Sequence, residues 1–266
     1  MNPVEVCQGD GPIVLGLPHT GTHVSDAIAA QLNPRGQALD DTDWHIHTLY
    51  DGLLSDATTV RATFHRYVID ANRDPTGVSL YPGQNTTGLV PLTDFDGKNI
   101  WRVTPNAVEI EARRQAFHAP YHAALQAELT RVHARHGIAI LYDCHSIRSH
   151  IRFLFDGQLP DFNIGTNLGT TCALEIETAV LEICESSAGY SSILNGRFKG
   201  GWTTRNYGQP DKGIHAIQME LAQSSYLAAE SAPWTYDPTR ADLLRAHLKT
   251  ILETLAALAP TLRGTS

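Results

Sequence analysis

Short apolar runs alternate with helical patterns along this chain, and the alternation restricts its fold more than any other feature. Apolar or β-branched runs typical of strands cover residues 13–17 (IVLGL), 59–69, 138–142 (IAILY) and 214–221 (IHAIQMEL). Helical patterns cover residues 25–32, 105–136, 174–185 and 240–258. Ser25 is a plausible N-cap, and Pro120 is expected to kink or divide the second helix. The alternation predicts an α/β fold with a mostly parallel sheet covered on both faces.

Composition narrows the functional class. The 266 residues carry a formal net charge of −8, with no basic stripe, so we expect no nucleic-acid partner. No apolar run approaches the length of a membrane helix, and the N-terminus lacks the pattern of a signal peptide, so we expect no membrane partner and a cytoplasmic location. The four cysteines form no CxxC pair, which excludes a zinc ribbon.

Two histidines follow buried strands. His19 comes after the run 13–17, and His145 lies in the sequence DCHS after the run 138–142. Ligands of open α/β sheets gather at the carboxyl ends of strands, and catalytic zinc takes three His, Asp, Glu or Cys ligands. A lone histidine is more often structural, but two at equivalent strand ends favour a metal site. Asp143 is the candidate to orient a ligating histidine.

The third ligand is expected in the sequence DTDWHIH at residues 41–47. Asp43 is preferred and His45 is the alternative. A structural interpretation also exists, because Asp41 or Asp43 could cap the next helix. His23 is expected on the first turn of the helix that follows His19 rather than on the metal.

Glu220 is the candidate general base. It lies within the apolar run 214–221, where a carboxylate is costly to bury unless it is paired or hydrogen-bonded. A zinc hydrolase needs a carboxylate that takes a proton from water and passes it to the leaving amine. The alternative is a buried ion pair with an arginine.

Five arginines lie in polar or Gly-rich settings. They are Arg66, Arg73, Arg148, Arg197 and Arg205. Each alone is most often a surface residue, but a guanidinium matches a carboxylate in a bidentate pair, and a dicarboxylate would need at least two. Asn72 and Thr204, beside these arginines, are also expected to contact the substrate.

Other catalytic classes lack their usual motifs. The sequence has no GxSxG elbow, no GxxxxGK[ST] loop and no GxGxxG, which argues against serine hydrolases, P-loop NTPases and Rossmann dehydrogenases. Cys144, beside His145, could be a thiol nucleophile, but a cysteine in an apolar strand is more often inert.

An ordered series of motifs spans nearly the whole chain. It runs LPHTG, DTDWHIHTLYD, RYVIDANR, YPGQNTTGLVP, DCHSIRS, LFDGQLPDFNIGT, NGRFKGGWTTRNYGQP and QMELAQSSY. The series resembles the N-formylglutamate amidohydrolases, enzymes of histidine degradation that release formate and L-glutamate. This family is distantly similar to zinc carboxypeptidases and aspartoacylases. The resemblance implies one three-layer α/β/α domain over residues 1–266, with a central mixed sheet.

The resemblance also assigns roles to residues. His19 and His145 match the two zinc-binding histidines of the carboxypeptidases, Asn72 and Arg73 their Asn-Arg pair, and Glu220 their late glutamate. The partner of the first histidine departs from the pattern, since Thr22 stands where those enzymes have Glu.

We therefore expect a zinc amidohydrolase with one Zn²⁺ per chain on His19, Asp43 and His145. Glu220 is expected to act as the base, and Arg73 to polarise the formyl carbonyl. The substrate is expected to be N-formyl-L-glutamate, a small N-acyl dicarboxylic amino acid, and the protein a monomer or small homo-oligomer. Two alternatives remain: a deacylase with a larger acyl pocket, and an inactive protein that senses an amino-acid derivative. The segment 74–96 is the natural lid.

Overall fold

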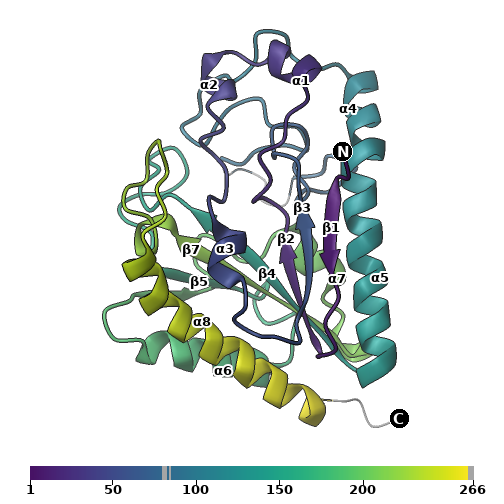
Figure 1. Cartoon of the computed structure of the whole chain (residues 1–266), viewed down its shortest axis with the longest axis vertical. Coiled ribbons are helices and arrows are strands. Elements are labelled where there is room, and N and C mark those ends of the chain that lie inside the picture. The colour runs from purple at the N-terminus through teal and green to yellow at the C-terminus, as the bar shows by residue number, and fades with distance from the viewer. Residues whose placement is uncertain (80–82, 84, 263–266) are drawn as a thin grey trace.

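One mixed sheet organises the part of the chain that the structure describes, residues 1–79, 83 and 85–262 of a computed structural model (Figure 1). Its strands lie in the order β1-β3-β2-β4-β7-β5-β6. The strands are β1 (Val4–Cys7), β2 (Ile13–Leu17), β3 (Thr58–Ala62), β4 (Ala139–Ile147), β5 (Phe162–Gly165), β6 (Ser192–Leu194) and β7 (Ile214–Ala222).

The central strands are parallel. β2 pairs in parallel with β3 and β4, and β4 pairs in parallel with β7. Antiparallel pairing is limited to β1 with β3 and β5 with β7, while β5 and β6 are parallel. The expected α/β fold with a mixed, mostly parallel sheet is confirmed. The carboxyl ends of β2, β3, β4 and β7 therefore meet at one edge of the sheet.

Helices cover both faces of the sheet (Figure 1). The long α5 and the short α7 pack on one face, while α3, α6 and α8 pack on the other. The helices are α1 (Asp26–Gln31), α2 (Pro34–Gln37), α3 (Ile46–Tyr50), α4 (Ala107–Arg113), α5 (Ala119–His136), α6 (Leu174–Ser186), α7 (Trp202–Tyr207) and α8 (Pro238–Leu258). Short 3₁₀ turns cover Pro210–Lys212, Gln223–Ser225 and Ala259–Leu262.

Covering both faces explains why the central strands read as continuous apolar runs. Ile140 and Tyr142 of β4 point into the core beneath α8, whereas Leu141 points into the core beneath α5. All nine residues of β4 are buried. In a strand buried on both faces, a polar side chain is costly unless it has a hydrogen-bond or ion-pair partner. Asp143 and His145 therefore mark a functional position.

Two strand predictions need correction. The strand expected over residues 59–69 ends at Ala62, because His65 folds the chain into a turn: its carbonyl accepts the Val68 N–H at 2.9 Å and its ring accepts the Tyr67 N–H at 3.0 Å. β4 is longer than the apolar run that predicted it, so His145 lies inside the strand rather than beyond its end.

The predicted helices are present with small shifts. Asn106 begins α4 with a capping box, and Gly137 ends α5 in the left-handed conformation. The interruption expected at Pro120 is a π-helical turn at Arg114–His118, after which α5 begins with Pro120 in its first turn. Ser25 takes the N-cap position of α1 without a side-chain cap bond.

Two interpretations of residues near helix starts do not hold. Neither Asp41 nor Asp43 caps α3, because His45 takes that position. His23 is not on α1 but forms an isolated bridge with Phe64.

The segment 74–96 forms a loop where it is described, and residues 80–82 and 84 lie outside the described residues. Among the helices that the structure describes, none is both long and apolar enough to cross a membrane.

Candidate metal centre and active site

Adjacent strands align the candidate catalytic side chains. In the parallel ladder of β4 and β7, His145 lies opposite Glu220 and Asp143 lies opposite Gln218. Residues two apart on a strand share a face, so all four side chains lie on one face of the sheet. His19 follows the neighbouring β2 and is 3% exposed. The sheet register therefore brings both histidines and the carboxylate to one buried position.

Asp43 reaches the same position from a turn. Its backbone N–H donates to the His19 carbonyl at 3.1 Å, which ties the turn to the end of β2. Its Oδ1 accepts from Arg66 at 2.6 Å, and its Oδ2 accepts from the backbone N–H of Ser146 at 3.0 Å. Burial disfavours the charged form of Asp43, but the Arg66 charge and both histidines together outweigh burial. The pKa of Asp43 is therefore lowered.

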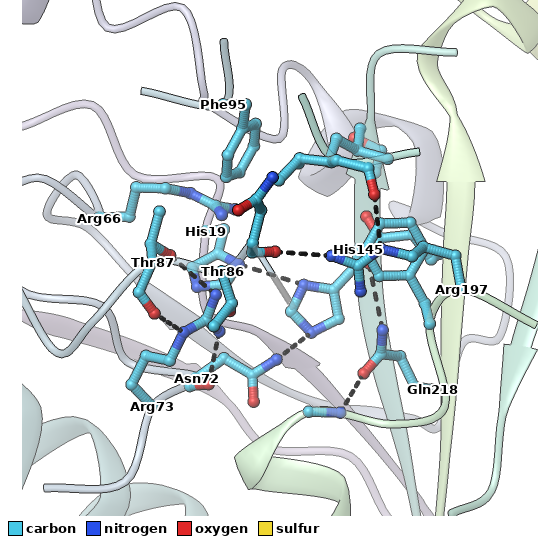
Figure 2. Close-up of a pocket in the computed structure, with 17 residues that line it drawn as sticks. His19, Arg66, Asn72, Arg73, Thr86, Thr87, Phe95, His145, Arg197 and Gln218 are labelled. Carbon is cyan, nitrogen blue, oxygen red and sulfur yellow. Dashed lines mark hydrogen bonds between the residues drawn. The ribbon is translucent and has the colours of Figure 1, made fainter. Parts of the chain in front are cut away.

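Three ligand atoms converge in the centre of this arrangement. The Nδ1 atoms of His19 and His145 lie 3.2 Å apart, and Asp43 Oδ2 lies 3.9 Å from the first and 3.3 Å from the second. His19, Asp43 and His145 form a group of potential metal ligands whose ligand atoms all lie within 4.8 Å of one another. Figure 2 shows the two labelled imidazoles facing each other at the floor of the pocket.

A carboxylate lies behind each histidine. His19 Nε2 is 2.7 Å from Asp70 Oδ1, and His145 Nε2 is 3.2 Å from Asp143 Oδ1. Thr204 donates its hydroxyl to Asp143 Oδ2 at 3.0 Å and holds that carboxylate in place. His19 Nε2 is hydrogen-bonded to Asp70, whereas the hydrogen-bond partner of His145 Nε2 is Asn72 Nδ2 at 3.1 Å. An imidazole held through its Nε2 has its Nδ1 available for a metal, which is the common arrangement at zinc-binding histidines.

The charges of the cluster favour a cation. Burial and the Arg66 charge lower the pKa of His19 to about 4, so this ring is neutral. Burial opposes protonation of His145 too, but Asp143, Asp43 and Glu220 raise its pKa well above the usual value. Lone pairs of two imidazoles and a carboxylate facing one another repel unless a proton or a metal lies between them. Two nitrogen donors and one oxygen donor fit the three-ligand set of a catalytic zinc.

The alternative ligand is engaged elsewhere. His45 adopts a left-handed backbone conformation with φ 59°. Its Nε2 lies 2.8 Å from the Trp234 carbonyl, so the ring points toward the loop before α8 and away from His19 and His145. The structure thus brings Asp43, and not His45, to the two histidines.

Glu220 lines the pocket beside the ligand group. Burial raises the pKa of Glu220 to about 8, although His145 opposes that shift. Gln218 donates to Glu220 Oε2 at 3.1 Å and accepts the backbone N–H of Gly201 at 2.6 Å. No salt bridge joins Glu220 to an arginine among the described residues, which argues against the ion-pair interpretation.

The pocket holds about 610 Å³ including its opening to solvent. Three of the five candidate arginines line it, namely Arg66, Arg73 and Arg197, and so does Asn72. Arg73 donates to the Thr87 carbonyl and hydroxyl, both at 2.8 Å. Arg197 donates to the carbonyls of Leu154 and Asn85, at 2.9 and 2.8 Å. Among the described lining residues the pocket wall is thus rich in cations, and Glu220 supplies the one carboxylate.

The remaining predicted substrate contacts lie outside the pocket lining. Arg148 donates to Asp96 at 3.1 Å and lines a separate crevice. Arg205 donates to the Gly200 carbonyl at 2.9 Å. Thr204 is fully buried against Asp143 and supports a metal-site histidine instead of facing the cavity.

Cys144 does not face the site. Its side chain alternates with His145 along β4 and packs in the core beneath α6 and α8. Burial raises the pKa of its thiol well above the usual value. A protonated thiol on the opposite face of the sheet cannot attack a substrate in this pocket.

Sequence reasoning gave no role to several residues that shape the site. Asp70 lies two positions before the Asn72-Arg73 pair, and this spacing within RYVIDANR was the available signal. Gln218 lies two positions before Glu220, which places both on one strand face. Phe95, Thr86 and Thr87 come from the loop between β3 and α4, and no periodicity points to them.

The chain is similar to known proteins over most of its length. Residues 11–227 match the N-formylglutamate amidohydrolase family. The N-formylglutamate deformylase of Pseudomonas aeruginosa is 44% identical over 253 residues, covering 94% of each chain. The N-formylglutamate deformylase of Pseudomonas putida matches to the same extent.

Solved structures show the same fold. The crystal structure of N-formylglutamate amidohydrolase from Ralstonia eutropha JMP134 superposes with a TM-score of 0.81 at 23% identity, covering 98% of this chain and 99% of that one. The Atu2144 gene product of Agrobacterium tumefaciens superposes with a TM-score of 0.73 at 16% identity, covering 97% and 96%.

Proposed function

Because the chain belongs to the N-formylglutamate amidohydrolase family, we propose that it hydrolyses N-formyl-L-glutamate to formate and L-glutamate. One observation carries the proposal beyond the family: His19, Asp43 and His145 converge beside Glu220 in a pocket lined by arginines. We take residues 1–266 as one catalytic domain, and histidine degradation as the process it serves.

We assign one Zn²⁺ to His19 Nδ1, His145 Nδ1 and Asp43. Zinc so held would activate a water molecule and polarise the acyl carbonyl. The surrounding groups support this assignment: Asp70 and Asn72 hold the two rings through Nε2, while Arg66 and the Ser146 N–H hold the Asp43 carboxylate.

Glu220 moves the proton. Its carboxylate accepts a proton from the attacking water and delivers it to the amide nitrogen as the C–N bond breaks, so that the amine leaves neutral. A pKa near the working pH favours both transfers, and burial raises that of Glu220 toward this range. Gln218 keeps one carboxylate oxygen oriented through its hydrogen bond.

Arg66 is placed to stabilise the oxygen that gains charge. It lines the pocket, and its buried Nε–H has no hydrogen-bond partner among the described residues. We assign this role to Arg66 rather than Arg73, because Arg73 gives its donors to Thr87 and the Asn72 carbonyl. A preoriented donor at a developing negative charge lowers the barrier most when it is desolvated.

Arg73 and Arg197 are assigned to the two carboxylates of the substrate. Both lie in the pocket wall, and both bond to chain segments at its opening. A substrate carboxylate that binds Arg73 must therefore compete with Thr87. Arginine forms two parallel hydrogen bonds to a charged carboxylate, and these are stronger than its bonds to the neutral oxygens of Thr87.

The test is formate release from N-formyl-L-glutamate by zinc-loaded and chelator-treated protein. We expect turnover only with metal, and its return when zinc is restored. Succinyl and acetyl derivatives in parallel would detect a deacylase of other specificity. Folded, zinc-loaded protein that releases no formate would reject the substrate.

The ligand set has a matched test. Asp43→Asn is expected to lose most of the bound zinc, while His45→Ala is expected to keep it, because only the first side chain faces the two histidines. Metal content measured after gel filtration compares the two. Equal zinc retention in both variants would remove Asp43 from the ligand set.

A further inference from the structure

The pocket has an exposed end and a buried end, and the two differ in chemistry. Asn85 and Thr86 are exposed, and the partly buried Arg73 and Arg197 reach toward that segment. At the buried end the lining side chains Phe95 and Ile147 are only 7% and 5% exposed. Two of the three lining arginines, Arg73 and Arg197, therefore lie toward the opening, while Phe95 and Ile147 lie deep inside beside the buried Arg66.

This polarity orients the substrate that the proposed function assigns, and the inference rests on that function. The reacting carbonyl must lie at His19, His145 and Glu220, and the amino-acid carboxylates must reach Arg73 and Arg197. The carbon substituent on the acyl side then points away from the amino acid. It points toward one of the two walls that flank the histidines.

One of these walls is closed by hydrogen bonds. Figure 2 shows Asn72 and Gln218 on one side of the two histidines and Phe95 with Arg66 on the other. Asn72 Oδ1 accepts the Thr203 N–H at 2.8 Å, and Gln218 binds the Gly201 N–H. Even an added methyl at Gly201 would lie 2.2 Å from Asn72 Nδ2. That wall presents polar amide groups fixed by hydrogen bonds, whereas Phe95 offers apolar surface, so we place the acyl substituent against Phe95.

The ring of Phe95 is held firmly. Its backbone N–H donates to the buried Asp41 Oδ2 at 2.9 Å. Its face lies 4.9 Å from the guanidinium of Arg66, which is itself bound to Asp43. It also packs in a small apolar cluster with Ile147 and Ile151. A ring held by these contacts limits the length of whatever lies against it.

A second crevice lies behind the ring. It is lined by Asp41, Arg148 and Gln223 among others, and it shares Phe95, Ser146 and Ile147 with the substrate pocket. Phe95 is therefore one of three residues that lie between the pocket and this crevice. We propose that Phe95 determines acyl specificity, closing the acyl end of the pocket so that a formyl hydrogen fits and a methyl or longer chain does not.

The experiment compares wild-type protein with Phe95→Ala and Phe95→Leu on N-formyl-, N-acetyl- and N-propionyl-L-glutamate. The quantity measured is the ratio of kcat/KM for acetyl to that for formyl. We expect Phe95→Ala to raise the ratio about tenfold or more, because one methyl group is worth roughly that factor in a shaped apolar pocket. Phe95→Leu is expected to raise it less and guards against a variant that fails to fold.

Leu154→Ala is the matched control. Leu154 lines the same pocket and packs against the same apolar cluster, but its carbonyl bonds Arg197 toward the opening. Its truncation is expected to leave the acetyl-to-formyl ratio unchanged. Zinc content and thermal unfolding are measured for each variant, to test whether the metal site and the fold are retained.

The outcomes separate the two proposals. A wild-type enzyme that releases formate, with the same ratio in both Phe95 variants, would overturn the role of Phe95 and leave the proposed function intact. A wild-type enzyme with equal kcat/KM for the propionyl and formyl compounds would also overturn the role of Phe95 and leave the proposed function intact. Zinc-loaded protein that hydrolyses none of the three would overturn the proposed function, and the role of Phe95 with it.

Discussion

The Nδ1 atoms of His19 and His145 lie 3.2 Å apart in the folded protein, although the residues are separated by 126 positions in the chain. The contact exists because β2 and β4 are parallel neighbours and both deliver their polar residues to one edge of the sheet. Asp43 Oδ2 completes the group at 3.3 Å from the second ring. The following predictions depend on this cluster and on the groups that surround it.

Replacing Glu220 by Gln is expected to keep zinc and to lower kcat by about 10²–10⁴-fold, the usual contribution of a general base. The amide keeps the shape of the side chain but cannot accept the proton. Formate release and metal content measured on the same sample check both parts. Glu253→Gln, on the exposed face of α8, is the control and should retain wild-type turnover. Near-native kcat in Glu220→Gln would exclude Glu220 as the base.

Replacing Asp70 by Asn should weaken zinc binding about 10–100-fold, as expected when a carboxylate behind a ligating histidine is neutralised. Asp70 Oδ1 lies 2.7 Å from His19 Nε2 and also accepts the Asn72 N–H. Zinc affinity is measured by competition with a chelator. Asp74→Asn is the control, because among the described residues this carboxylate bonds only Thr76. Identical affinities in the two variants would contradict this role.

Replacing Gly201 by Ala should destabilise the fold by about 1–3 kcal/mol and reduce turnover, because the added methyl overlaps a buried side chain. The new carbon would lie 2.2 Å from Asn72 Nδ2, and Asn72 lies 3.1 Å from His145 Nε2. Gly88→Ala is the control, since the nearest atom to its added carbon is 4.0 Å away. Urea unfolding and formate release compare the two variants. A fully active, stable Gly201→Ala variant would show that Asn72 can move to make room for the added methyl group.

Only Cys7 should react with iodoacetamide in the native protein at pH 8. Cys7 is exposed, whereas the other three cysteines are buried. Burial raises the pKa of Cys172 and Cys184 to about 12, and that of Cys144 well above its usual value, so their thiolate forms are scarce. Mass spectrometry counts the labels, with denatured protein as the control for full reactivity. Cys144→Ala should remain active. An inactive, folded variant would support Cys144 as a thiol nucleophile.

The stability of the protein should fall on acidification partly through His122. Burial lowers the pKa of His122 to about 3, and the ring bonds the Ala71 carbonyl and the Tyr207 hydroxyl as a neutral group. Between its usual pKa and this value the unfolded chain binds a proton that the folded protein does not. Stability from this residue is therefore complete near pH 7 and is lost as the pH falls.

The size of that effect can be measured with His122→Gln, which keeps a polar side chain at the site. At pH 5 a single histidine with this shift accounts for about 2 kcal/mol of the loss relative to pH 7. Urea unfolding at both pH values should show a smaller decrease for the variant than for the wild type. An equal decrease in the two proteins would mean that His122 titrates normally.

Much of this molecule follows from local sequence. The apolar runs predict the central strands because those strands are buried on both faces, and the α/β fold follows from their alternation with helices. His19, His145 and Glu220 stand out because each is a polar residue in or beside an apolar run. Burying such a group is costly, so its presence there is informative without any knowledge of its neighbours.

Tertiary structure decided what local pattern could not. The sequence favours Asp43 as the third ligand but leaves His45 as an alternative, and only the turn before α3, with His45 directed to the Trp234 carbonyl, separates them. Asp70 gains its importance from a ring that is 51 positions away in the chain. Arg148 resembles the pocket arginines in sequence but lies behind Phe95. Each distinction depends on contacts between segments far apart in the chain, and such contacts have no periodicity for a sequence to display.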